Sequence, residues 1–252
     1  MSEPDPTQRF SDRAENYARY RPGYPPAVLD CLRDEFGLTR ETVVADVGSG
    51  TGILTEMFLQ RGHTVYAVEP NEAMRAAAER ALGHYLRFVS VAGRAEATGL
   101  PDGSVGLVAA GQAFHWFDGP AARVEFGRIL EPGGWVALVW NARLHEGDPF
   151  MAAYEGTLGA FGLGYHAVTH RSHRGEMDAL FTRGYQERVF EHSRPLDWDA
   201  LWGGFLSASY APLPGDPRYE PLRQALRDAF EAHRQAGQVR FRYLTNLYVG
   251  QL

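Results

Sequence analysis

The sequence of 252 residues contains no lysine, because all 25 of its basic residues are arginine. Without a lysine amine, the chain cannot form the Schiff base that pyridoxal-phosphate chemistry needs. It also lacks the phosphate-binding lysine of a Walker A loop or a protein kinase. Against 31 acidic residues, the arginines leave a formal net charge of −6. No basic field is present to attract a phosphate backbone, so we expect no nucleic-acid partner.

Cysteine and long apolar runs are also scarce. The single cysteine, Cys31, cannot form an internal disulfide or a cysteine-rich zinc site, and we expect a buried thiol. The apolar run at 135–140 is far shorter than the roughly 18 residues that a membrane span needs. Residues 1–6 lack the basic and apolar regions of a signal peptide. We therefore expect a cytoplasmic protein that does not engage a membrane.

An alternation of apolar and helical segments occupies residues 42–140. Strands are predicted at 42–47, 64–68, 87–92, 105–110 and 135–139. Helices are predicted at 53–60, at 121–130 and from the cap residue Asn71 to Leu82. Because strands separated by helices form βαβ units, this order predicts an α/β fold with a Rossmann-like, doubly wound, mostly parallel sheet. Farther along, the β-prone run at 239–249 is expected to enter the sheet as an antiparallel C-terminal strand.

A glycine-rich loop joins the first predicted strand to the first predicted helix. Residues 43–52 read V-V-A-D-V-G-S-G-T-G, with glycine at three alternate positions. Glycine permits the sharp turn and lets a ligand approach the main chain. Glu69 ends the second predicted strand, where a carboxylate can accept hydrogen bonds from both hydroxyls of a ribose. The two features together predict a nucleotide-binding site.

Two details bear on which nucleotide is bound. A dinucleotide loop reads G-x-G-x-x-G, but Ile53 stands where its third glycine would be. Asp46 lies two residues before the loop, where its carboxylate would be repelled by a pyrophosphate. The same carboxylate would be stabilised by a ligand that carries a sulfonium and an ammonium group. S-adenosyl-L-methionine has both charges and no phosphate.

The stretch 42–140 resembles the core of the class I S-adenosylmethionine-dependent methyltransferases. The loop is similar to the D-x-G-x-G-x-G motif of that family, and Glu69 to its ribose-binding acid. Residues 93–96 followed by 100–101 resemble the adenine-binding segment, and 130–134 is similar to the turn before the fifth strand. The resemblance implies a methyltransferase enzyme with S-adenosyl-L-methionine as its cofactor.

A narrower resemblance extends over most of the chain. Its signatures are F-x6-Y-x3-R-P-x-Y-P from Phe10, Q-A-F-H-W-F from Gln112 and Y-x-T-x2-Y-x-G from Tyr243. They resemble the trans-aconitate methyltransferase-like branch, methyltransferase type 11. This resemblance implies a small-molecule acceptor, with a carboxylate as one candidate.

The resemblance also implies a set of cofactor contacts. The expected residues are Tyr17, Arg21, Asp46, Gly48, Ser49, Gly50, Glu69, Pro70, Met74, Ala95, Glu96, Gln112 and Ala113. Arg94 departs from the pattern, because such enzymes often place an aspartate there for the adenine amino group. The adenine amino group would then donate to Glu96 or to a backbone carbonyl. Alternatively, Arg94 would stack on the adenine ring.

Methyl transfer from a sulfonium is an in-line displacement in which the protein mainly positions the reactants. A general base is needed only when the nucleophile carries a proton. His115, after the fourth predicted strand, is the candidate catalytic residue, either as that base or as a wall of the pocket. The candidate substrate-binding residues are His115, Trp116, Arg143 and His145.

Three histidines, His166, His170 and His173, would share one face of a helix. Arg171 and Arg174 bring repelling charge, and no acid completes a metalloprotease pattern. We interpret this segment as a solvated or substrate-facing helix and expect no metal.

The chain is interpreted as one methyltransferase domain with four parts. These are an N-terminal helical cap at 1–41, the cofactor-binding core at 42–140, a substrate-selecting insert at 141–184, and strands and helices at 185–252 that complete the sheet. Two alternatives stay open. One is an NAD(P)-dependent reductase, although a lysine-free chain cannot supply the Y-x-x-x-K site of short-chain reductases. The other is a non-catalytic nucleotide-binding module. The oligomeric state is not predicted.

Overall fold

The computed structural model describes residues 20–163, 174–208 and 210–252. Its elements, in chain order, are α2 (Ala27–Phe36), β1 (Val44–Val47), α3 (Ile53–Gln60), β2 (Val65–Val68), α4 (Glu72–Leu82), β3 (Phe88–Val91), β4 (Val105–Gly111), the 3-10 helix η3 (Phe114–Trp116), α5 (Gly119–Ile129), β5 (Leu130–Arg143), α6 (Pro149–Ala160), α7 (Arg174–Leu180), β6 (Tyr185–Leu196), α8 (Trp198–Leu206), α9 (Tyr219–His233) and β7 (Val239–Gly250).

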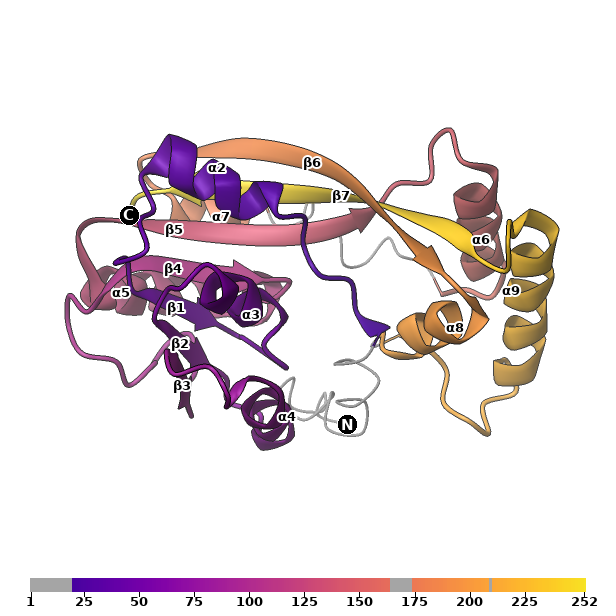
Figure 1. Cartoon of the computed structure of the whole chain (residues 1–252), viewed down its shortest axis with the longest axis horizontal. Coiled ribbons are helices and arrows are strands. Elements are labelled where there is room, and N and C mark those ends of the chain that lie inside the picture. Colours follow the sequence, from indigo (N-terminus) through magenta and orange to yellow (C-terminus); the bar gives the residue numbers. More distant parts are fainter. Residues whose placement is uncertain (1–19, 164–173, 209) are drawn as a thin grey trace.

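One seven-stranded sheet runs through the molecule in the order β3-β2-β1-β4-β5-β7-β6 (Figure 1). From β3 to β5, each strand pairs in parallel with the next one in this order. β7 enters between β5 and β6 and is antiparallel to both. The predicted α/β fold, with a mostly parallel sheet and an inserted antiparallel C-terminal strand, is confirmed.

Local sequence signals account for several element ends. α4 begins after Asn71, as predicted, because the Asn71 side chain accepts a hydrogen bond of 2.9 Å from the Met74 N–H. α3 begins after Gly52, whose left-handed φ of 88° turns the chain from loop to helix. All four residues of β1 are buried, as expected for a parallel strand covered on both faces.

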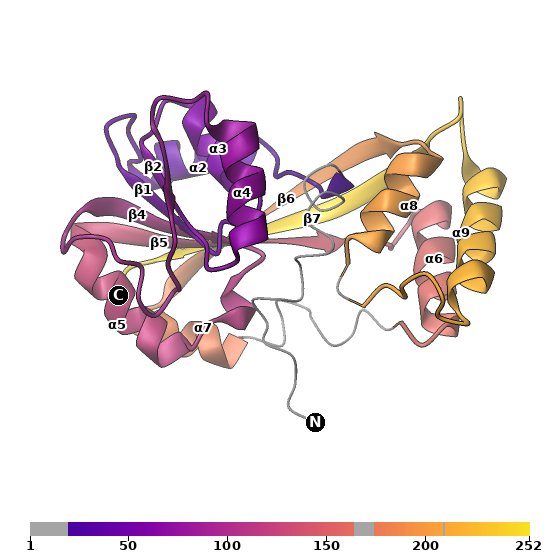
Figure 2. The same cartoon turned by 90° about the horizontal axis from the view of Figure 1, so that it is seen from below.

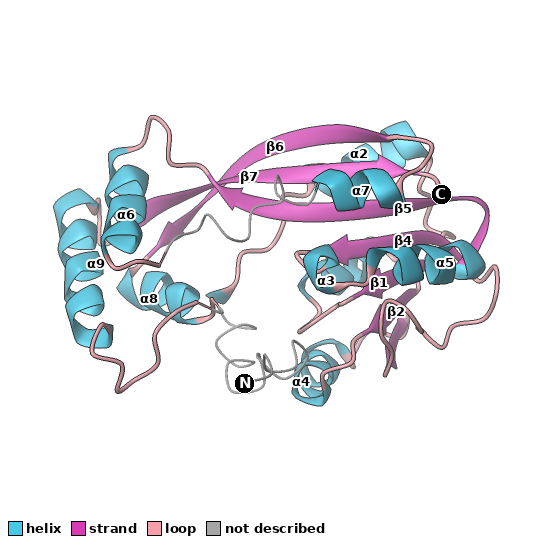
Figure 3. Cartoon of the chain, turned by 180° about the vertical axis from the view of Figure 1, so that it is seen from behind, coloured by secondary structure: helices cyan, strands magenta, loops and turns pink. Residues whose placement is uncertain are grey.

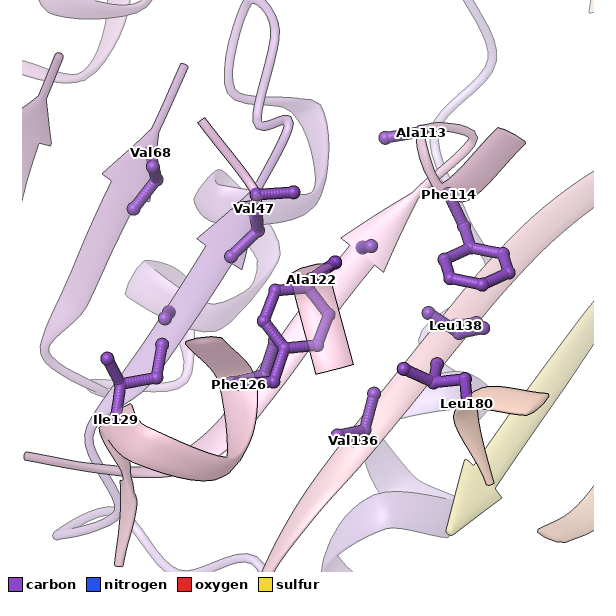
Figure 4. Close-up of a cluster of buried hydrophobic side chains, with 14 of the residues drawn as sticks. Val47, Val68, Ala113, Phe114, Ala122, Phe126, Ile129, Val136, Leu138 and Leu180 are labelled. Carbon is purple, nitrogen blue, oxygen red and sulfur yellow. The ribbon is translucent and has the colours of Figure 1, made fainter. Parts of the chain in front are cut away.

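Helices cover both faces of the parallel part of the sheet. α2 and α3 lie on one face, and α5 and α7 lie on the other (Figure 3). Figure 4 shows Leu180 of α7 beside Val136 and Leu138 of β5, whereas Phe126 and Ile129 of α5 join the same buried cluster nearer to β1. Burial of these side chains supplies the main driving force for folding. Cys31 of α2 belongs to the core of the opposite face, and burial raises the pKa of its thiol to about 11.

The predicted fifth strand differs from the observed one at both ends. β5 begins at Leu130, which pairs with Val105, whereas Leu107 pairs with Trp135. The intervening residues form a bulge around Gly133, whose φ is 83°, so the predicted turn lies inside the strand. β5 then continues to Arg143 because β7 pairs with it along that length.

The strands β5, β6 and β7 extend beyond the parallel core and carry a second lobe. α6, α8 and α9 pack around the far ends of β6 and β7 (Figure 2). The second lobe has its own buried cluster, which includes Tyr154, Phe205, Phe230 and Phe241. In the described parts of the chain, no helix has the length and apolarity to cross a membrane.

Candidate active site

A cavity of about 280 Å³ lies where the parallel core meets the second lobe. Its core side is formed by residues after β1, β2, β3 and β4, which is where parallel sheets bind ligands. A smaller cavity of about 30 Å³ adjoins it beneath the glycine loop. Arg21, Gly48, Gly50 and Gln112 line both cavities, which makes the small one a continuation of the large one.

The glycine loop depends on backbone angles that favour glycine. Gly48, Gly50 and Gly52 have φ of 68°, 57° and 88°. The N–H of Gly48 donates to the Val68 carbonyl at 2.8 Å, which ties the loop to the end of β2. A Cβ on Gly48 would lie 2.7 Å from the Cβ of Ala113, so the loop also needs glycine there for space. Ser49 lines the smaller cavity.

Gly48→Ala and Gly50→Ala form a matched pair of predictions. Each variant places an alanine in the left-handed backbone region, which destabilises the folded state by about 1–2 kcal/mol. Gly48→Ala also forces its Cβ against Ala113, whereas a Cβ on Gly50 would have no neighbour within 4 Å. We expect Gly48→Ala to lose about 1–3 kcal/mol more in free energy of unfolding than Gly50→Ala. Urea denaturation measures both, and equal losses would contradict the packing of the loop on Ala113.

Glu69, which follows β2, holds its carboxylate in a fixed orientation on the cavity wall. Its Oε2 accepts from the Gly50 N–H and its Oε1 accepts from the Asn71 N–H, both at 2.9 Å. Burial raises the pKa of Glu69, and the two N–H donors oppose that rise. Arg75, which sequence reasoning missed, donates to the carbonyls of Glu69 and Pro70 at 2.8 Å and 2.7 Å. This arginine fixes the backbone that carries the acid.

Asp46 is almost fully buried at the end of β1 and lines the smaller cavity. Its Oδ2 accepts a hydrogen bond of 2.6 Å from the Thr55 hydroxyl. Its Oδ1 has no hydrogen-bond partner among the described residues. Burial raises the pKa of Asp46 to about 7, the Thr55 hydrogen bond opposes the rise, and the nearby charge of Glu69 adds to it. A cationic group in the small cavity would therefore stabilise the ionised carboxylate.

A second group of predicted residues lines the cavity after β2 and β3. It comprises Pro70, Met74, Arg94, Ala95 and Glu96. Arg94 is 3.6 Å from Glu96 in an ion pair, and its side chain is 63% exposed. Glu96 also accepts a hydrogen bond of 2.8 Å from the N–H of Asp118. Glu96 and Arg94 thus lie together at the cavity and form an ion pair with each other, and Glu96 also binds the backbone of Asp118.

The segment after β4 turns sharply into the cavity. Gln112 adopts a φ of 56°, and its side-chain amide donates to the Asn141 carbonyl at 3.2 Å. This turn carries Ala113, His115 and Trp116 onto the cavity wall. The rings of His115 and Trp116 are 4.8 Å apart. His115 is therefore placed beside the cavity, where both of its predicted roles require it to be.

The N-terminal segment closes another side of the cavity. Arg21 lines it, and its Nη2 donates to the Ser207 carbonyl at 3.5 Å, which links the segment to the end of α8. The Asn141 side chain donates to the Gly23 carbonyl at 3.0 Å. Asn141 was not predicted, although it lines both cavities. Tyr17 lies outside the described residues.

Arg143 lines the second-lobe side of the cavity and is largely buried, with a side chain 11% exposed. Its Nε and Nη2 donate to the Glu155 carboxylate, and its Nη1 donates to the Tyr210 hydroxyl at 2.7 Å. The guanidinium also lies 5.5 Å from the ring centroid of Tyr154. His145 is exposed and does not line this cavity.

The described part of the chain contains no cluster of three or more histidine, cysteine, aspartate or glutamate side chains that could hold a metal ion. The three histidines at 166, 170 and 173 lie outside the described residues.

Comparison with known proteins identifies the family. Residues 45–138 match the sequence family described as "Methyltransferase domain". An uncharacterised methyltransferase from Geobacillus kaustophilus is 30% identical over 160 residues, which are 58% of this chain and 71% of that protein. The chain belongs to the class I S-adenosylmethionine-dependent methyltransferases. S-adenosyl-L-methionine, the cofactor predicted from the sequence, is the cofactor of this family. Membership removes the reductase alternative.

Other relatives of this methyltransferase are matched over part of their length. An uncharacterised methyltransferase from Mycobacterium tuberculosis is 39% identical over 139 residues, 55% of this chain and 54% of that protein. One from Schizosaccharomyces pombe is 35% identical over 145 residues, 53% of each chain. The chain spans about half the length of these curated relatives.

Solved structures share the fold. One from Anaeromyxobacter dehalogenans has a TM-score of 0.71 and 24% identity, over 92% of this chain and 98% of that chain. A methyltransferase from Geobacter sulfurreducens, solved in complex with S-adenosyl-L-homocysteine, has a TM-score of 0.52 and 19% identity over 98% and 99% of the two chains. These likenesses establish the methyltransferase fold alone.

Proposed function

We propose that this protein transfers the methyl group of S-adenosylmethionine to a small-molecule acceptor. The observation that carries the proposal is the Glu69 carboxylate, held by the N–H groups of Gly50 and Asn71 on the wall of the cavity of about 280 Å³. A carboxylate in this place can accept hydrogen bonds from the two hydroxyls of a ribose. When bound, S-adenosylmethionine supplies an electrophilic methyl group, whose bond to sulfur breaks as its bond to the acceptor forms.

The residues around the two cavities fit the charges of this cofactor. Asp46 has a buried oxygen beside the smaller cavity that no described residue hydrogen-bonds, which suits the ammonium and sulfonium end. Arg21 lines the same cavity and suits the methionyl carboxylate. Glu69 stands between this end and the group of residues after β2 and β3, to which we assign the adenine. Arginine thus takes the anion-binding role that lysine cannot fill in this chain.

In this proposal, the protein acts mainly by positioning the acceptor and excluding water. His115 lies on the cavity wall and takes a proton from an acceptor that must lose one. For an acceptor without such a proton, His115 forms part of the wall. We expect neither a nucleic acid nor a membrane as a partner.

Ligand-induced stabilisation tests the proposal directly. A ligand that binds only the folded state at about 100 times its Kd adds roughly 2.7 kcal/mol of stability. For a chain of this size, this corresponds to a rise in Tm of about 5 °C or more. We expect S-adenosylmethionine and S-adenosylhomocysteine to produce the rise and NAD⁺ to produce none. A rise with NAD⁺ alone would sink the proposal.

A further inference from the structure

The cavity has a distal half, formed by its lining residues from Trp140 onward, at the end of β5 and in the second lobe. Aromatic side chains dominate its wall, and they include Tyr154, Phe205, Tyr210, Phe241 and Tyr243. Among the described residues of the distal half, Arg143 is the one that carries a charge. The character of this half therefore depends on how the Arg143 charge is compensated.

Protein groups already neutralise the Arg143 charge. Both oxygens of Glu155 accept from its guanidinium, one from Nε and the other from Nη2 at 3.1 Å. The Tyr210 hydroxyl accepts from the remaining terminal nitrogen at 2.7 Å. Each nitrogen of the guanidinium is thus directed at a partner of this chain. A bidentate pair of this kind leaves the distal half without a net charge from its described residues.

This arrangement discriminates against an anionic acceptor. A carboxylate that binds Arg143 must displace Glu155, whose side chain is 20% exposed. Displacement would leave the Glu155 carboxylate without compensation, and loss of one partner of a largely buried ion pair is strongly unfavourable. An uncharged acceptor avoids the exchange.

The distal half also has features that favour a ring. Aromatic walls attract a further ring by stacking or by edge-to-face contact. Ala200 and Gly204 of α8 line the same half, and a methyl group and a hydrogen in place of larger side chains leave space beside the aromatic residues. Tyr210 offers one directed polar contact, because its oxygen accepts from Arg143 and its own proton can be donated.

We propose that the distal half binds an uncharged, ring-bearing acceptor, one oxygen of which accepts a hydrogen bond from Tyr210. This inference rests on the proposed function and names the class of acceptor. It runs against the carboxylate acceptor that the sequence resemblance suggested, because the guanidinium of Arg143 is committed to Glu155.

A pair of probes of matched shape tests the inference. The protein is saturated with S-adenosylhomocysteine and titrated calorimetrically with 2-naphthol and with 2-naphthoate. We expect 2-naphthol to bind at least about tenfold more tightly, because 2-naphthoate brings an uncompensated charge. Equal or tighter binding of 2-naphthoate would overturn the inference, and so would failure of both probes to bind.

Two variants and one control variant locate the effect. Glu155→Gln leaves Arg143 without its carboxylate, so the preference should shift toward 2-naphthoate by roughly tenfold. Glu146→Gln, at an exposed position, is the matched control and should leave the preference unchanged. Ala200→Leu places a larger side chain in the distal half and should weaken 2-naphthol while S-adenosylhomocysteine binding is retained. An unchanged preference in Glu155→Gln would contradict the inference.

The two proposals fail in different ways. If S-adenosylhomocysteine does not bind the wild-type protein, the proposed function falls and this inference falls with it. If S-adenosylhomocysteine binds but 2-naphthol does not bind more tightly than 2-naphthoate, only the assignment of the acceptor class falls.

Discussion

Replacing Glu69 with alanine is expected to lower the affinity for S-adenosylmethionine by roughly 100-fold or more. The carboxylate would accept two hydrogen bonds from the ribose, and hydrogen bonds to a charged group contribute about 1.5–3 kcal/mol each. The substitution also frees the N–H groups of Gly50 and Asn71, which now fix the acid against the loop. Both effects weaken binding, and isothermal titration calorimetry measures their sum.

The control for this prediction is Glu72→Ala, three residues away. Glu72 is exposed in the first turn of α4 and does not line the cavity, so its removal should leave the affinity unchanged. Circular dichroism checks that both variants fold. A loss of less than about threefold in Glu69→Ala would show that Glu69 does not bind the ribose, because even one such hydrogen bond contributes more.

Asp46→Asn is expected to stabilise the protein without cofactor at alkaline pH while weakening cofactor binding. Burial raises the pKa of Asp46 from 3.8 to about 7 on folding. Between pH 3.8 and about pH 7, the folded state holds a proton on Asp46 that the unfolded state has lost. The free energy of unfolding therefore falls as the pH rises through this range. The total loss by pH 8 is about 4 kcal/mol. Asparagine does not titrate, so Asp46→Asn should avoid this loss.

Urea denaturation at pH 5 and pH 8 measures the stability effect. The advantage of Asp46→Asn over the wild type should grow between these values, whereas Asp228→Asn, at an exposed position, should show no such growth. Cofactor affinity should fall by about tenfold, as expected for one charge-assisted contact. In the wild type, affinity should also rise with pH up to about 7, because only the ionised carboxylate attracts the cation. A pH-independent difference in stability would contradict the buried, titrating Asp46.

The grouping of the residues that we assign to the cofactor was predictable because their signals are local. The glycines of the loop specify left-handed angles within five residues, and Glu69 follows the next strand at the same sheet edge. Parallel topology then brings these segments together without further information. Burial of Asp46 follows from its place in a strand covered on both faces.

The distal half of the cavity was not predictable in the same way. Arg143 was predicted as a substrate contact, but its partners Glu155 and Tyr210 lie 12 and 67 residues away. Neither belongs to a motif, and their meeting depends on how α6 and the segment after α8 pack in the second lobe. His145, the neighbouring predicted substrate contact, does not line the cavity. Two residues past Arg143, it is exposed because the chain has already left β5.

The position of β7 has a consequence for the order in which the chain can assemble. This strand is the last of the seven in sequence, yet it lies between β5 and β6 and pairs with both. During synthesis, the five parallel strands can therefore form a sheet while β6 has no partner to join. The second lobe, which packs on the far ends of β6 and β7, must wait for the same strand. The distal half of the cavity therefore forms late and through contacts between residues far apart in the sequence. Such contacts slow folding and leave strand edges unpaired until they form.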